Sequence, residues 1–371
     1  MVAAGDEPFM DRALFLAERG RGRTSPNPVV GAVVVRPDGV VVGQGAHLEL
    51  GAPHAEVAAL DAAGPRARGA TLYCTLEPCV HHGRTGPCVE RIAAAGVARV
   101  VAAMRDPNPL VNGAGVAFLR ARGIDVVLGV RAEAAARQNA PFLRWIRRRR
   151  PFVTIKTATS ADGFVGRAGE RVHLTGAAAD RHFHRQRAAI DAIAVGSGTV
   201  VADDPVLTAR GAYRHRPLTR VIFDWRLRVP ASARVFATVG AGPVIMVVSA
   251  GAALDRPAVV AGFTARGAEV ESVPPHDLAG VLARLAARGI TWLLVEGGPT
   301  LHAAFCRAGL VDHVQWVLSP RMLGGGVAAG GAVADLAESA AEIRRTTLGG
   351  DTLIEFDVHR TDRSDGPDCA R

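Results

Sequence analysis

The most informative stretch of the chain runs from Pro53-His-Ala-Glu-Val57 through Thr75-Leu-Glu-Pro-Cys79 to Cys88. It supplies one imidazole and two thiolates, His54, Cys79 and Cys88, which are good zinc ligands, and one carboxylate, Glu56, that need not be a ligand. Zinc held by three protein ligands keeps its fourth position for water and lowers the pKa of that water to about 7. Glu56 can then move the protons, so this stretch predicts a hydrolytic deaminase.

The pattern of ligands separates a catalytic zinc site from a structural one. A structural zinc site more often uses four protein ligands, whereas this stretch supplies three. A single His-x-Glu often arises by chance, but its combination with Pro-Cys and a later cysteine is specific. We expect the ligand-bearing segments to begin helices, so that helix dipoles and free N–H groups keep the thiolates of Cys79 and Cys88 ionised.

Helix-like and strand-like stretches alternate on both sides of this segment. We expect helices over residues 12–19, 54–63 and 88–95, and strands over residues 29–35, 71–75 and 99–103. Alternation of this kind predicts a sheet between two layers of helices.

A domain boundary is expected near the middle of the chain. Four arginines, Arg147 to Arg150, precede Pro151, whose ring disfavours helix in the residue before it. A length of 371 residues also favours two domains over one. We therefore expect a first domain over 1–149, a second over 150–360 and a polar tail over 361–371. The arginine run is more typical of a solvated helix end than of a nucleic-acid contact.

A second alternating series begins at Phe152. We expect strands over residues 152–157, 190–195, 220–223, 244–248, 292–295 and 313–318, and helices over residues 278–288 and 299–308. Within this series, Glu296-Gly-Gly-Pro-Thr300 ends a strand, turns on two glycines and begins a helix, which suits the binding of a cofactor phosphate. Taken alone, the same turn fits a plain chain reversal equally well.

The composition narrows the class of protein. A hydrophobic fraction of 49% with 42 Gly and 22 Pro indicates a globular α/β protein. Five cysteines are too few for a disulfide framework and predict a reducing, cytoplasmic location. The longest uncharged stretch, residues 235–254, is interrupted by glycines and a proline, so we expect no membrane span.

Charge alone leaves two classes of partner open. The net charge of +9 is compatible with nucleic acid and also with small phosphorylated molecules. Among the 44 basic residues the only lysine is Lys156. Its retention in an arginine-rich chain indicates that a compact ammonium is required, because the planar guanidinium of arginine is bulkier.

The motifs together resemble those of the family of bifunctional diaminohydroxyphosphoribosylaminopyrimidine deaminases and aminouracil reductases of riboflavin synthesis, over nearly the whole chain. In the first domain they are Gly22-Arg-Thr-Ser-Pro-Asn-Pro-Val-Val-Gly31, Gly45-Ala-His47, Pro53 to Val57, Thr75 to Cys79, Gly86-Pro-Cys88 and Asp106-Pro-Asn-Pro109. In the second domain they are Lys156 to Thr159, Ser160-Ala-Asp-Gly163, Gly196 to Arg210 and Glu296-Gly-Gly-Pro-Thr300.

The resemblance implies a fold and a set of roles. The first domain should be a cytidine-deaminase-like three-layer α/β/α domain, and the second a dihydrofolate-reductase-like α/β domain. The implied substrate contacts are Asn27, His47, Arg187, Leu207, Arg210 and Glu296. The implied NADPH contacts are Lys156, Thr159, His173, Thr199, Asp203, Gly297, Gly298, Pro299 and Thr300. Arginine suits a sugar phosphate because its forked donors match phosphate oxygens in pairs.

The implied reaction sequence begins with zinc-dependent deamination of 2,5-diamino-6-(5-phosphoribosylamino)pyrimidin-4-one. NADPH-dependent reduction of the ribosyl group then gives 5-amino-6-(5-phosphoribitylamino)uracil. The expected partners are this phosphorylated pyrimidine and a second copy of the chain, without nucleic acid or membrane. The sequence departs from the family at His173, where tryptophan is usual, at Ala114, often lysine, and at Ala161, where leucine or methionine is usual.

Two other classes of function share parts of this pattern. A nucleic-acid or free-base deaminase, with an inactive reductase-like domain, would use the same zinc chemistry. Nucleic-acid deaminases of this kind carry Cys-x-x-Cys, however, whereas Cys79 and Cys88 enclose a longer segment. A zinc-stabilised binding module is the other alternative, and a proton carrier at Glu56 would be superfluous in it.

Overall fold

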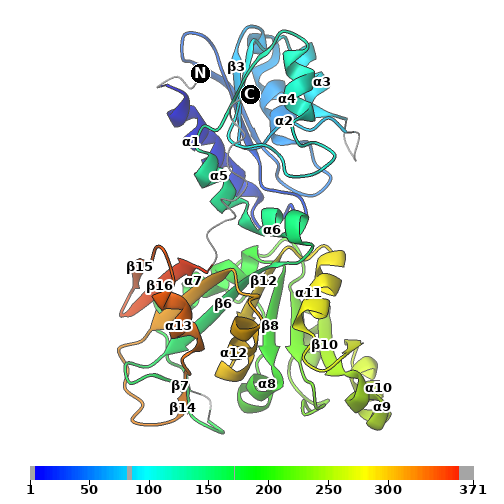
Figure 1. Cartoon of the computed structure of the whole chain (residues 1–371), viewed down its shortest axis with the longest axis vertical. Helices are drawn as coiled ribbons and strands as arrows, with labels where there is room; N and C mark the ends of the chain where they lie inside the picture. Colours follow the sequence, from blue (N-terminus) through cyan, green and yellow to red (C-terminus); the bar gives the residue numbers. More distant parts are fainter. Residues whose placement is uncertain (1–4, 82–85, 171, 359–371) are drawn as a thin grey trace. The chain divides into compact units, whose positions relative to one another are not determined.

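The chain divides into two compact units, Met1–Arg150 and Pro151–Arg371, each with its own sheet (Figure 1). The structure is a computed structural model that describes residues 5–81, 86–170 and 172–358. The expected polar tail at 361–371 lies outside the described residues. Within the described part, no helix is both long and apolar enough to cross a membrane.

The first unit is built on a five-stranded sheet with the order β2-β1-β3-β4-β5. β1 is antiparallel to both of its neighbours, while β3, β4 and β5 run parallel. Its strands are β1 (Gly31–Val35), β2 (Val41–Ala46), β3 (Thr71–Cys74), β4 (Arg99–Ala102) and β5 (Asp125–Leu128).

Helices cover both faces of this sheet. On one face lie α2 (Ala55–Ala63), α3 (Cys88–Ala94) and α4 (Ala114–Arg120), and on the other α1 (Asp6–Ala17) and α5 (Ala132–Gln138). Successive side chains of β1 therefore enter different cores: Val34 packs with the first set of helices and Val33 with the second. The expected three-layer α/β/α arrangement is confirmed. The unit ends with α6 (Ala140–Arg148).

The second unit contains a nine-stranded sheet with the order β11-β10-β9-β8-β12-β6-β13-β16-β15. β16 and β15 join antiparallel at one edge and the other strands run parallel. The strands are β6 (Phe152–Thr159), β8 (Ala192–Gly196), β9 (Thr219–Phe223), β10 (Val244–Ser249), β11 (Glu269–Val273), β12 (Trp292–Glu296), β13 (His313–Leu318), β15 (Arg344–Leu348) and β16 (Asp351–Asp357). A small separate sheet pairs β7 (Phe164–Gly166) with β14 (Val327–Ala328).

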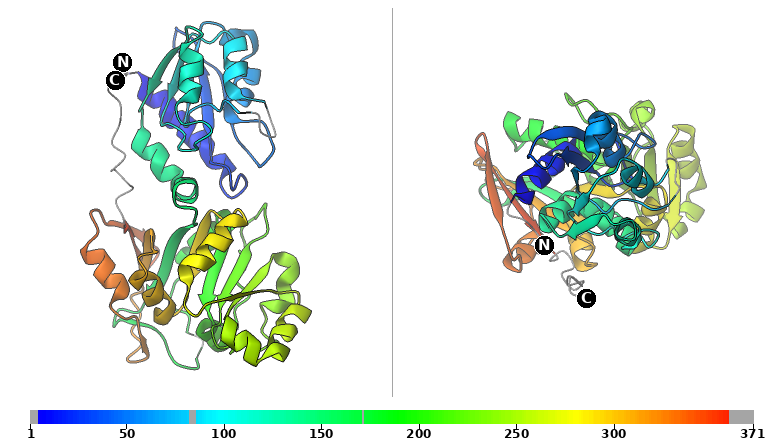
Figure 2. Two further views of the ribbon diagram at one scale, coloured as in Figure 1. Left: turned by 45° about the vertical axis from the view of Figure 1, so that its right-hand side comes forward. Right: turned by 90° about the horizontal axis from the view of Figure 1, so that it is seen from above.

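Helices also lie on both faces of the larger sheet (Figures 1 and 2). One core packs the sheet against α11 (Leu278–Ala287), α12 (Pro299–Arg307) and α13 (Ala332–Glu338). The opposite face packs against α7 (Ala177–Ala189), α8 (Ser197–Asp203), α9 (Ala250–Asp255) and α10 (Pro257–Ala265). The expected fold class of two α/β domains is confirmed.

Several expected elements have different bounds, among them the first helix of the chain and the first strand of the second unit. The helix expected over 12–19 begins at Asp6 and ends at Ala17. The strand expected over 152–157 continues to Thr159, so Lys156 lies inside the strand instead of at its end.

Candidate functional site

Three side chains of the first unit converge as a metal-binding cluster. His54 is the N-cap of α2, Cys88 is the first residue of α3, and Cys79 lies in the loop that follows β3. His54 Nδ1 is 3.2 Å from Cys88 Sγ and 3.5 Å from Cys79 Sγ. One imidazole and two thiolates at this separation fit a zinc site with one position left for water.

The expectation that Cys79 begins a helix is wrong, because it lies in the loop between β3 and α3. The N-terminus of α3 nevertheless acts on it, since the backbone N–H of Cys88 donates to Cys79 Sγ at 3.4 Å. A hydrogen bond from the Cys88 thiol lowers the pKa of Cys79 to about 4 and raises the pKa of Cys88 itself. A cation held by both sulfurs would favour the thiolate form of each.

Glu56 lies in the first turn of α2, beside the ligands, and its side chain is buried. Burial raises its pKa to about 7, and the charge of His54 opposes this only in part. A carboxyl group that exchanges its proton near neutral pH suits general acid–base catalysis. The position and the raised pKa of Glu56 therefore suit the predicted role of proton carrier.

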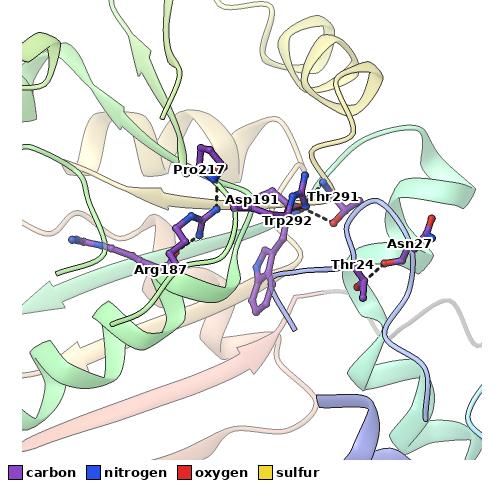
Figure 3. Close-up of polar contacts among 9 residues, drawn as sticks. Thr24, Asn27, Arg187, Asp191, Pro217, Thr291 and Trp292 are labelled. Atoms are coloured by element: carbon purple, nitrogen blue, oxygen red, sulfur yellow. Dashed lines mark hydrogen bonds and ion pairs between the residues drawn. The ribbon is translucent and has the colours of Figure 1, made fainter. Parts of the chain in front are cut away.

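Asn27 and His47 form a short network next to the ligands. His47 Nδ1 is 3.2 Å from the carbonyl oxygen of Pro53, which can only accept, so Nδ1 carries the proton. The other ring nitrogen accepts from the Asn27 amide at 3.3 Å. The rings of His47 and His54 meet edge to face with centroids 5.3 Å apart. The Thr24 hydroxyl donates to the backbone carbonyl oxygen of Asn27 at 3.2 Å (Figure 3).

Glu77 has a role that its place in the sequence did not reveal. Its buried carboxylate accepts three backbone N–H groups, from Asp106 at 3.3 Å, Gly113 at 3.0 Å and Val116 at 3.1 Å. It thereby fixes the Asp106-Pro-Asn-Pro109 motif and the start of α4 to the loop that carries Cys79. The motif Thr75 to Cys79 contained Glu77, but partners so distant in sequence could not be inferred from spacing.

In the second unit, Arg187, Glu296 and Lys156 form a partly buried charged cluster. Arg187 of α7 donates to both carboxylate oxygens of Glu296, at 2.9 Å and 2.5 Å. Glu296 and Lys156 are register partners on β12 and β6, and the Lys156 ammonium lies 4.8 Å from the ring centre of Phe183. Burial alone would raise the pKa of Glu296, but Arg187 and Lys156 hold it at about 2. Burial lowers the pKa of Lys156.

The glycine turn expected to bind phosphate follows this cluster. β12 ends at Glu296, and Gly298 is the N-cap of α12. A Cβ on Gly298 would meet no atom within 4 Å, so a ligand can approach this backbone. A Cβ on Gly297 would lie 3.7 Å from Thr199 Oγ1. The N-terminal part of α8 therefore lies beside the glycine turn.

The other residues of the second unit that were expected to contact NADPH or substrate differ in burial and in hydrogen bonding. Thr159 is buried and accepts from Trp316 Nε1 at 2.9 Å. His173 has 68% of its side chain exposed and bonds Asp180 at 2.8 Å. Asp203 is the last residue of α8. The segment that follows carries Leu207 and Arg210 and contacts α7.

Comparison with known proteins matches both units. The RibD C-terminal domain matches residues 151–349, and the cytidine and deoxycytidylate deaminase zinc-binding region matches residues 4–104. The riboflavin biosynthesis protein RibD of Aquifex aeolicus is 38% identical over 360 residues, which cover 96% of this chain and 99% of that protein. The Escherichia coli protein of the same name is 41% identical over 334 residues, covering 86% of this chain and 89% of that one.

Two solved structures match nearly the whole chain. Acinetobacter baumannii RibD, form 1, has a TM-score of 0.81 and 35% identity, covering 95% of this chain and 98% of that one. The diaminohydroxyphosphoribosylaminopyrimidine deaminase/5-amino-6-(5-phosphoribosylamino)uracil reductase of Thermotoga maritima has a TM-score of 0.80 and 33% identity over the same shares. The chain therefore belongs to the RibD family of bifunctional deaminases and reductases of riboflavin biosynthesis.

Proposed function

We propose that the first domain deaminates 2,5-diamino-6-(5-phosphoribosylamino)pyrimidin-4-one and that the second reduces the ribosyl group of the product with NADPH. The product of both steps is 5-amino-6-(5-phosphoribitylamino)uracil. The observation that carries the first step is the buried Glu56, whose pKa is about 7, beside a cluster of three zinc ligands. The name of the Thermotoga maritima relative supports the same substrate and the same order of steps.

In the deaminase site the chain supplies the ligands, the proton carrier and the substrate contacts. A zinc ion bound by His54, Cys79 and Cys88 would lower the pKa of a bound water. Glu56 takes a proton from the attacking water and delivers it to the departing amine, so that water is consumed and ammonia released. Asn27, held by its bond to His47, is placed to bind the pyrimidine.

In the reductase site the chain mainly orients two ligands. NADPH, when bound, would supply a hydride to C1 of the ribosyl group; the C1–O bond of the ring breaks and its oxygen takes up a proton, which leaves a ribityl chain. We assign its phosphates to the turn over 297–300 and its further contacts to Lys156, Thr159, His173, Thr199 and Asp203. Arg187, Leu207, Arg210 and Glu296 face the sugar phosphate, and the Arg187 donors not committed to Glu296 or to the Thr208 carbonyl remain for phosphate oxygens.

The proposed partner is therefore a small phosphorylated pyrimidine instead of nucleic acid, and we expect the chain to act as a homo-oligomer. Cys74, Cys79, Cys88 and Cys306 are free cysteines, which supports a reducing, cytoplasmic location.

The test is to incubate the purified zinc-loaded protein with the diaminopyrimidinone phosphate, with and without NADPH. We expect ammonia release in both samples and NADPH oxidation only after ammonia has formed. Removal of zinc by a chelator should abolish ammonia release. Absence of ammonia would refute the deaminase assignment, and deamination of single-stranded DNA or cytidine in its place would favour the alternative deaminase function.

A further inference from the structure

The segment over residues 204–218, between α8 and β9, has an unusual backbone. It contains neither helix nor strand, yet it carries Leu207 and Arg210, two of the proposed substrate contacts. Asp204 and Leu207 have φ values of 42° and 59°, in the left-handed region that residues other than glycine rarely adopt. Such a conformation persists only where the surroundings fix it. The Leu207 side chain supplies part of that restraint, because it is buried in a core.

The C-terminal end of α7 holds the same segment by hydrogen bonds. His184 Nδ1 accepts the backbone N–H of Arg210 at 3.2 Å. Arg187, which also binds Glu296, donates through Nη1 to the carbonyl of Thr208 at 3.5 Å. One short stretch of helix thus contacts both Glu296 and the segment that carries Arg210.

Arg214 adds a third connection between α7 and the segment 204–218, besides those of His184 and Arg187. Its Nη1 donates to the backbone carbonyl of Arg187 at 2.6 Å, and its Nη2 to the carbonyl of Pro217 at 3.1 Å. Figure 3 labels Arg187 and Pro217, the two residues whose backbone carbonyls accept these hydrogen bonds. The last carbonyls of a helix have no partner within it, and a cation there also suits the helix dipole. Arg214 therefore joins the end of α7 to the segment.

We propose that Arg214 is a positioning residue for the reduction, which fixes the segment against α7 so that Arg210, Leu207 and Arg187 face the same sugar phosphate. Two of its nitrogens are committed to backbone carbonyls and its Nε is buried without a partner, so it acts through the segment and not on the substrate. This inference rests on the proposed reductase function and adds a residue to it.

The decisive variant is Arg214→Ala in the full-length protein. It removes both hydrogen bonds, so we expect the KM for the deaminated phosphoribosyl substrate to rise at least about tenfold, because small misplacements of binding groups are costly. The KM for NADPH and the deaminase activity should stay near their original values. Arg214→Lys keeps a cation that reaches one carbonyl at a time, and should recover part of the loss.

The controls separate this effect from loss of charge or of folding. Arg185→Ala removes the same charge from an exposed position on α7 and should leave the KM unchanged. His184→Asn keeps an acceptor for the Arg210 N–H, whereas His184→Leu removes it, so only the leucine variant should raise the KM. Thermal unfolding of each variant verifies that the second domain is folded.

The outcomes distinguish the two proposals. If the original protein does not reduce the deaminated substrate, the proposed function fails. If it does, and folded Arg214→Ala has an unchanged KM or an equal rise in the KM for NADPH, the positioning role is refuted. Should Arg214→Ala not fold, Arg214→Lys and His184→Leu decide: unchanged KM values in both refute the role, and raised KM values for the phosphoribosyl substrate alone support it.

Discussion

Two glutamates of this chain, one buried and one partly buried, have opposite protonation behaviour because their neighbours differ. Glu56 is buried close to two cysteines, and burial raises its pKa to about 7. Glu296 has 13% of its side chain exposed, and the charges of Arg187 and Lys156 hold its pKa at about 2. Near neutral pH the first can exchange a proton, while the second stays ionised as a fixed negative charge. The same residue type is thus suited to proton transfer at one position and to a fixed charge at the other.

The role of Glu56 can be tested by Glu56→Gln. Glutamine has nearly the same size but cannot carry the proton, so deamination should fall roughly 100- to 10,000-fold. The ligands His54, Cys79 and Cys88 remain, so the metal content should not change, and reduction of the deaminated substrate should continue. The measurements are zinc by elemental analysis, ammonia release and NADPH oxidation. Normal ammonia release would contradict the assignment, and loss of zinc would make Glu56 a ligand.

The ammonium of Lys156 can be tested by Lys156→Arg. The side chain is enclosed between Glu296 and the ring of Phe183, and Arg187 already occupies the Glu296 carboxylate. A second, larger guanidinium does not fit there, so reductase kcat/KM should fall at least about tenfold, with deamination unchanged. Unaltered reduction at subsaturating NADPH and substrate would show that any cation serves at this position.

At the scale of elements, the deaminase site depends on the close contact between α2 and β2. A Cβ on Gly45 would lie 2.5 Å from the Ala55 carbonyl oxygen, and one on Gly43 would lie 2.2 Å from that of Ala59. Only glycine lets the helix approach the strand so closely. Because His54 is the N-cap of α2 and Glu56 lies in its first turn, the glycines on β2 set the position of both.

The variant Gly45→Ala tests this dependence. The added methyl group meets helix backbone, which cannot move without shifting α2, so the first domain should lose about 2 kcal/mol of stability. Zinc affinity and deamination should fall with it, while reduction persists. Gly5→Ala is the matched control, because a Cβ there meets no atom within 4 Å. Equal zinc affinity and equal unfolding midpoints in the two variants would contradict the proposed constraint.

The periodicity of the sequence predicted several apolar strands but missed others, including the largely buried β16. β10, β12 and β13 are rich in buried apolar residues and were all predicted. β2, with its two glycines, and β15, Arg344–Leu348, whose residues are mostly exposed, were not. Their strand conformation is imposed by pairing with β1 and β16, which a local pattern does not contain.

The two candidate sites also differed in how much of each could be predicted from the sequence. The zinc ligands and Glu56 lie within a short stretch of known spacing, so their chemistry could be inferred before their geometry. The ion pair between Arg187 and Glu296 joins residues that are 109 positions apart. The resemblance implied that both face the substrate, but only the folded chain shows that they bind each other.

At the scale of the whole molecule, the two units have separate cores. The buried clusters of the first contain residues between Met10 and Ala135, and those of the second contain residues between Val153 and Phe356. None of the residues that the structure describes belongs to clusters of both units, so each unit has the apolar interior that independent folding requires.

We therefore expect fragments 1–150 and 151–371 to fold separately, each with one activity. Each should unfold in a single cooperative transition, followed by circular dichroism in urea. The first should bind zinc and release ammonia, and the second should oxidise NADPH with the deaminated substrate. A first fragment that lacks cooperative unfolding even with zinc would show that its stability depends on the second.

The position of Lys156 also allows the opening of the second domain to be followed by chemical labelling of a single lysine. Lys156 carries the only lysine amine of the sequence, and that residue is partly buried in the folded second domain. Acylating reagents need a free, unprotonated amine in contact with solvent, so this position should react slowly while the domain is closed. Modification at Lys156, read by peptide mass, would then record how often the β6–β12 region opens. Ligands that fill the reductase site should slow it, which gives a binding assay independent of turnover.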